Sequence, residues 1–176
     1  MAAAGSNTQP ELVTGLFRSR ADAERAYEAL ASRGYSRDDV NLMMSDEARR
    51  RHFTDADSEL GDKALQGAGV GSAICGTVGA VVAAIAAIGT SLVLPGLGLV
   101  VAGPLAAALA GAGAGGLTGG LVGALVGAGI PEDRARAYEA GIKEGGIVMG
   151  VHPRTPEDAE YLEQEWKNYR GEQVFR

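Results

Sequence analysis

The sequence predicts an α+β fold: a ferredoxin-like (βαβ)2 domain that is split by an inserted, apolar helical hairpin. Three observations support this prediction. A strand–helix–strand pattern occurs near each end of the 176-residue chain, and the two patterns share a motif where their helices begin. All charged side chains lie outside residues 64–131, so the middle of the chain differs sharply in composition from both ends.

The first βαβ unit follows the N-terminal residues. Its expected elements are a strand at 11–17, a helix from Ser19 to Gly34 and a strand at 40–44. Ser19 is followed three residues later by Asp22, which is typical of a helix N-cap. Gly34 predicts the end of the helix, because glycine adopts the left-handed backbone that closes many helices.

The second unit repeats this order near the C-terminus. Its expected elements are a strand at 146–151, a helix from Thr155 to about Arg170 and a short strand at 173–175. Thr155 and Asp158 repeat the Ser19 and Asp22 motif, and Pro156 occupies the first helical position. We expect Gly171 to end this helix. A further helix at 131–144 should connect the insertion to the sheet.

Each unit alone is too small to bury a stable core. We therefore expect residues 11–63 and 130–176 to form one split domain with four antiparallel strands and helices on one face. Residues 1–10 are expected to be a flexible N-terminus. Residues 64–129 are expected to be the inserted helical hairpin.

Small residues recur every fourth position along the insertion, whose uncharged block holds 18 Gly and 17 Ala. This spacing lets helix backbones approach closely. The candidate helix-packing and oligomerisation residues are Gly67, Gly71, Gly79, Gly111, Gly115, Gly119, Gly123 and Gly127. The hairpin turn is expected at Pro95, Gly96 and Gly98, and the second helix should begin near Pro104.

The composition of the insertion favours a lipid environment. Residues 104–128 contain eight glycines, which disfavour a helix in water, and neither expected helix has a polar face. About 25 helical residues reach about 37 Å, which is enough to cross a bilayer. We therefore expect a transmembrane hairpin. A hairpin buried in a soluble oligomer is an alternative, and so is a re-entrant or shallowly embedded pair, because the apolar turn at 92–104 carries no charge.

Every Lys and Arg flanks the insertion, so the positive-inside tendency predicts both termini in the cytoplasm and the hairpin in the inner membrane. The alternative location is a soluble cytoplasmic assembly. Residues 1–10 show no basic and apolar signal pattern, so we expect no cleavable signal peptide. The expected partners are the lipid bilayer and further copies of the chain.

The charge balance argues against nucleic acid as a partner. The chain has 16 Lys and Arg against 22 Asp and Glu, a net charge of −6, whereas binding phosphates needs a basic face. Its one basic run, 49–52, is flanked by acidic residues. This run is typical of a solvated helix face or of a membrane-proximal cluster.

No set of residues predicts catalysis. The two histidines, His52 and His152, lack partners at ligand spacing, and Cys75 occupies a small-residue position where packing explains it. The glycine-rich run 67–71 follows no strand, and no acid appears before Glu132, so it is not a dinucleotide loop. We expect no catalytic residue, cofactor, metal or small-molecule substrate, and hence no enzyme.

The arrangement resembles the bacterial heat-induced or general stress protein family, YflT-like. The residues that carry the likeness are Val13–Phe17, Ala23–Tyr35, Asp39–Met43, the glycine-zipper insertion, Gly129–Asp133 and Tyr138–Gly146. The resemblance covers about residues 11–170. It implies a stress-associated membrane or membrane-proximal protein, and it supplies no catalytic residues.

Together these patterns predict a non-enzymatic membrane protein. Its cytoplasmic α+β domain would be anchored and oligomerised by the glycine-zipper hairpin, in a scaffolding or envelope-protection role. Three alternatives remain at this point: a soluble particle that buries the apolar hairpins, a pore lined by the zipper helices, and a ligand-sensing module suggested by fold analogy alone.

Overall fold

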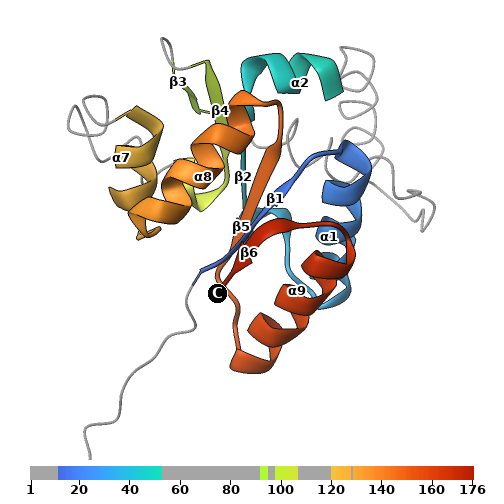
Figure 1. Cartoon of the computed structure of the whole chain (residues 1–176). Coiled ribbons are helices and arrows are strands. Elements are labelled where there is room, and N and C mark those ends of the chain that lie inside the picture. Colours follow the sequence, from blue (N-terminus) through green and yellow to red (C-terminus); the bar gives the residue numbers. More distant parts are fainter. Residues whose placement is uncertain (1–11, 53–91, 95–97, 107–119, 128) are drawn as a thin grey trace, which may run out of the picture.

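The computed structural model describes residues 12–52, 92–94, 98–106, 120–127 and 129–176 (Figure 1). This part of the chain has an α+β fold, as predicted. The strands are β1 (Val13–Phe17), β2 (Val40–Ser45), β3 (Leu92–Leu94), β4 (Leu99–Ala102), β5 (Ile147–Val151) and β6 (Glu172–Phe175). The helices are α1 (Arg20–Ser32), α2 (Asp46–His52), α7 (Gly120–Gly127), α8 (Glu132–Lys143) and α9 (Pro156–Asn168), with a 3-10 turn at Arg37–Asp39.

The strands form one antiparallel sheet in the order β3-β4-β2-β5-β1-β6. The four strands predicted from the βαβ units are neighbours in it, in the order β2-β5-β1-β6. At the centre, Val151 of β5 pairs with Val13 of β1 on one side and with Val40 of β2 on the other. The two halves of the chain therefore share one sheet.

The predicted helix starts are confirmed. The Ser19 hydroxyl accepts a hydrogen bond from the Asp22 N–H at 3.1 Å, and Thr155 accepts the equivalent bond from Asp158 at 3.1 Å. The predicted end of the last helix is wrong by one residue. Arg170 adopts the left-handed backbone there, with φ +59°. It is the second residue after the end of α9, as Gly34 is the second residue after the end of α1.

Helices cover both faces of the sheet, whereas the sequence predicted one face (Figure 1). Alternate residues of β1 show the reason. Val13 and Phe17 join the hydrophobic core under α1 and α9, and Leu16 joins a second core under α7 and α8. Helix α8 was predicted only as a connection. Its buried Tyr138 and Ile142 make it a packing layer instead.

The middle of the insertion belongs to the sheet, and this corrects the predicted apolar turn at 92–104. Strands β3 and β4 form a β-hairpin, and β4 pairs with β2 from Leu42↔Ala102 to Ser45↔Leu99. Gly98 does lie in a turn, as predicted, but this turn joins two strands. Pro95 and Gly96 lie outside the described residues.

A helix begins at Pro104, as predicted, and it is fixed to β2. The buried Asn41 side chain accepts a hydrogen bond from the Leu105 N–H at 2.7 Å and donates one to the Gly150 carbonyl at 3.3 Å. The prediction of one continuous helix over 104–128 is wrong at Gly120, because this first residue of α7 has φ +61°, whereas residues inside a right-handed helix have negative φ. Among the described residues, no helix combines the length and apolar character needed to cross a bilayer.

Gly103 is required by geometry rather than by helix packing. Its φ is +97°, and a Cβ there would lie 2.2 Å from the Val40 carbonyl oxygen. Gly103→Ala should therefore destabilise the chain by at least about 2 kcal/mol. Gly123→Ala is the matched control, because a Cβ at Gly123 meets no atom within 4 Å.

The measurement is urea unfolding followed by fluorescence of Trp166, the single, fully buried tryptophan. The control variant should match or exceed the wild type, since alanine favours a helix over glycine by about 1 kcal/mol. Equal midpoints for wild type and Gly103→Ala would contradict the placement of the hairpin beside β2.

Candidate functional site

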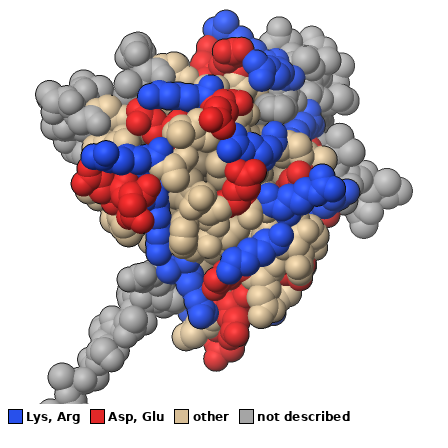
Figure 2. All heavy atoms as spheres, viewed as in Figure 1, with Lys and Arg blue, Asp and Glu red and all other residues tan. Residues whose placement is uncertain are grey.

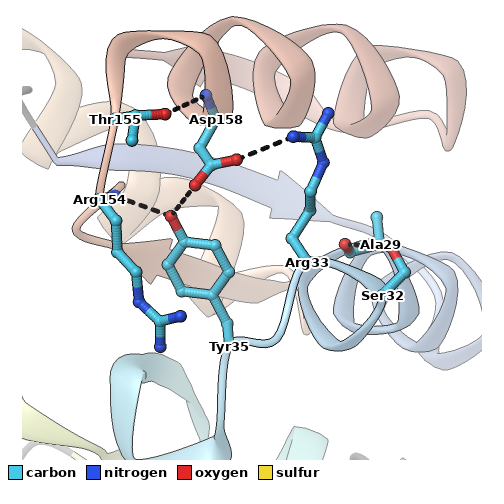
Figure 3. Close-up of polar contacts among 7 residues, drawn as sticks. All are labelled: Ala29, Ser32, Arg33, Tyr35, Arg154, Thr155 and Asp158. Carbon is cyan, nitrogen blue, oxygen red and sulfur yellow. Dashed lines mark hydrogen bonds and ion pairs between the residues drawn. The ribbon is translucent and has the colours of Figure 1, made fainter.

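Polar side chains from the two halves of the chain meet where α1 leads into β2 and β5 leads into α9 (Figure 3). We call Arg33, Tyr35, Asp39, Arg154 and Asp158 the loop cluster. The first three come from the N-terminal unit and the last two from the C-terminal unit, so the cluster joins segments more than 100 residues apart in sequence.

Tyr35 lies at the centre of the loop cluster and is 4% exposed. Its hydroxyl donates to Asp158 Oδ2 at 2.9 Å and accepts from the Arg154 N–H at 2.7 Å (Figure 3). Desolvation by burial is the main cause that raises the pKa of Tyr35, so the phenol stays neutral in ordinary conditions. A neutral hydroxyl that makes two hydrogen bonds is a structural link and a poor nucleophile.

Two guanidinium groups complete the loop cluster. Arg33 donates to Asp158 Oδ1 at 3.0 Å and stacks 4.0 Å from the ring centroid of Tyr161. Arg154 donates to Asp39 Oδ2 at 3.1 Å and stacks 4.5 Å from the Tyr35 ring centroid. The pKa of Asp39 is lowered, first by the Ser36 N–H that donates to its carboxylate.

Opposite charges are matched within the loop cluster, and its carboxylates are held by hydrogen bonds. Such an arrangement fixes two loops against each other, and it presents no activated nucleophile with an adjacent base. Sequence reasoning identified Asp158 only as a capping residue. Its long-range partners were missed, although Arg33 and Tyr35 belong to the motif that carries the family resemblance.

A second polar link lies under the other face of the sheet. The fully buried Tyr138 hydroxyl of α8 lies 2.6 Å from Thr14 Oγ1 of β1 and donates to the Gln173 carbonyl of β6 at 2.7 Å. Burial raises the pKa of Tyr138 to about 12. Gln173 has φ +50°, so this bond fixes a strained residue of the last strand.

The structure offers no metal-binding cluster among the residues that it describes. In this part of the chain no three His, Cys, Asp or Glu side chains are grouped to hold a metal ion. The buried side-chain nitrogen and oxygen atoms described here all have hydrogen-bond partners. His152 is exposed at the end of β5, and Cys75 lies outside the described residues.

Two of the candidate packing glycines can be placed. Gly123 and Gly127 lie on α7, and a Cβ at either would meet no atom within 4 Å. Val126 beside them is 43% exposed, while Leu121 and Leu125 of the same helix are buried against the core under α8. The remaining candidates lie outside the described residues: Gly67, Gly71, Gly79, Gly111, Gly115 and Gly119.

Comparisons of the chain with protein-family models, curated proteins and solved structures found no significant match. Its function is therefore inferred from its own residues. The loop cluster and the Tyr138 link hold the domain together, and the open face of α7 is its exposed apolar feature among the described residues.

Removing the Tyr138 hydroxyl should change how the free energy of unfolding depends on pH above pH 10. The folded-state pKa of about 12 exceeds the usual 10, so above pH 10 the unfolded chain loses this proton first. The stability from neutral Tyr138 is complete below pH 10 and is lost as pH rises toward 12, by about 2–3 kcal/mol.

Tyr138→Phe should be less stable by about 1 kcal/mol at pH 8, and the gap from wild type should narrow or reverse by pH 11. Urea unfolding at both pH values measures this difference. The control is Tyr161→Phe, which should lose as much stability between pH 8 and pH 11 as the wild type does. A gap that stays constant from pH 8 to pH 11 would contradict a buried, neutral Tyr138.

Proposed function

We propose that the chain is a non-enzymatic, stress-associated membrane protein with a scaffolding or envelope-protection role. Its ferredoxin-like domain would lie at the cytoplasmic face of the inner membrane, held there by uncharged segments that enter the bilayer and return on the same side. The strand order β2-β5-β1-β6, with helices after β1 and β5, supports a ferredoxin-like core that is split by an insertion. The stress role rests on the family resemblance.

The pairing of β4 with β2 is the observation that carries this proposal. It ties the midpoint of the uncharged block to the same sheet as both chain halves. Between Lys63 and Leu92 only 28 uncharged residues are available, whereas crossing a bilayer and returning takes about 40 helical residues. A re-entrant or shallow insertion suits this length, and we propose it in place of the crossing hairpin.

The second half of the insertion supports the same conclusion. Ala106 and Leu121 are both buried in the core under α8, and only 14 residues, 107–120, lie between them in the sequence. This length is too short for one crossing, which takes about 20 residues. Any contact of this segment with lipid would therefore be made from the side of the domain.

The open face of α7 supports self-association. Gly123 and Gly127 stand one helical turn apart, with Val126 exposed beside them and no charged residue on the helix. Small residues at this spacing allow two helices to pack closely. We propose that α7 packs against α7 of a second copy, so that the anchored protein is a homo-oligomer.

Sidedness of labelling tests the proposed anchoring. In a Cys75→Ser background, Pro104→Cys places a thiol at an exposed site within the predicted far turn, and Arg176→Cys marks the C-terminus. Membranes are extracted with carbonate, and both variants are labelled with an impermeant maleimide in right-side-out and inverted vesicles.

The proposal predicts that the chain stays with the carbonate-washed membrane and that both thiols react only from the cytoplasmic face. If Pro104→Cys were labelled from outside and Arg176→Cys from inside, this result would contradict the proposal and support a hairpin that crosses the bilayer. Release of the chain by carbonate as a large assembly would favour the soluble particle.

A further inference from the structure

We propose that α2 is a binding surface for the headgroups of anionic phospholipids; this inference rests on the proposed membrane function and names the lipid that the domain contacts. Three consecutive arginines, Arg49, Arg50 and Arg51, project from this short helix, with side chains 43%, 77% and 58% exposed. The opposite side of α2 is fixed to the domain through Ala48, which is fully buried.

The position of α2 places these arginines next to the described middle of the uncharged block. Its first residue, Asp46, donates its N–H to the Gly98 carbonyl at 2.7 Å, so the helix begins against the turn of the β3–β4 hairpin. In the sequence, the first uncharged segment begins at Ala64, 12 residues after the last residue of α2, His52; the residues between them include Asp55, Asp57, Glu59, Asp62 and Lys63. Basic residues that flank membrane-embedded segments in this way attract anionic headgroups.

Counted within α2 alone, the arginines outnumber the carboxylates with which they pair. Arg49 and Arg50 share one carboxylate, that of Asp46, at 3.2 and 2.7 Å. Arg51 pairs with Glu47 at 2.6 Å. Three guanidinium groups therefore face two carboxylates. Exposed pairs of this kind are weak, and the planar guanidinium matches the oxygens of a phosphate, so a headgroup phosphate can compete for these side chains.

The visible surface is electrostatically mixed, and α2 itself carries two acids beside its three arginines. On the face shown in Figure 2, Lys and Arg side chains alternate with Asp and Glu over the whole domain. Together with the net charge of −6, this disfavours a long polyanion such as nucleic acid, which needs an extended basic face. A lipid headgroup needs only a local site, and α2 supplies one.

Vesicle flotation with the full chain tests this inference. Protein diluted from detergent is mixed with vesicles of phosphatidylcholine alone or with vesicles that contain 30% phosphatidylglycerol, and the bound fraction is measured against lipid concentration. The variant Arg49→Gln/Arg50→Gln/Arg51→Gln should lose at least about fivefold in affinity for the anionic vesicles, because one basic residue near such a surface contributes about that factor. Its affinity for phosphatidylcholine should not change.

Two further variants separate charge from structure. Arg136→Gln/Lys143→Gln/Lys167→Gln removes three exposed cations that pair with acids one turn away on α8 and α9, and it should change binding less than twofold. Arg49→Lys/Arg50→Lys/Arg51→Lys keeps the charge and should retain most of the binding. Circular dichroism checks that each variant is folded.

Equal losses for the α2 variant and the control variant would overturn the inference. So would equal binding of the wild type to both kinds of vesicle, although this outcome would leave the membrane anchoring intact. A wild-type chain that binds neither kind of vesicle would overturn both the inference and the proposed function.

Discussion

The pairing of β4 with β2, completed by the buried Asn41, is the constraint on which the rest of the structure depends. Asn41 is fully buried and uses both ends of its side chain, accepting from Leu105 and donating to Gly150. Losing either partner would leave a buried polar group unsatisfied, so this link fixes where the insertion meets the sheet. Through it the insertion supplies β3, β4 and α7 to the domain, together with six of the 13 buried residues in the core under α8.

Local signals predicted much of the fold. Both helix caps, the four strands of the βαβ units and α8 were recognisable, because capping residues and alternating apolar runs act over a few residues. The β-hairpin at 92–102 was not recognised, since a short apolar run looks the same in a buried strand and in a membrane turn. The role of Gly103 was not recognised either, since its left-handed backbone beside Val40 depends on a contact between distant parts of the chain. The contact between Tyr35 and Asp158 depends on tertiary structure that no local pattern encodes.

The same constraint changes how the uncharged residues can meet lipid. A free helical hairpin has room to cross a bilayer, but an insertion fixed to the sheet at its midpoint offers only short segments that begin and end at the domain. This geometry is the basis of our proposal that the domain lies against the membrane, with α7 available to a second copy and α2 near the headgroups. The tight polar links at Tyr35 and Tyr138 suit such a role, because they hold the two chain halves together around the insertion.

Amide hydrogen exchange of the full chain, in detergent and in lipid vesicles, tests the central claim most directly. If β4 is part of the sheet, the amides of Leu99–Ala102 should be protected to nearly the same degree as those of Ile147–Val151 in both media. Exchange of Leu99–Ala102 at the rate of exposed amides, while Ile147–Val151 stays protected, would show that the insertion is independent of the sheet and would contradict this account.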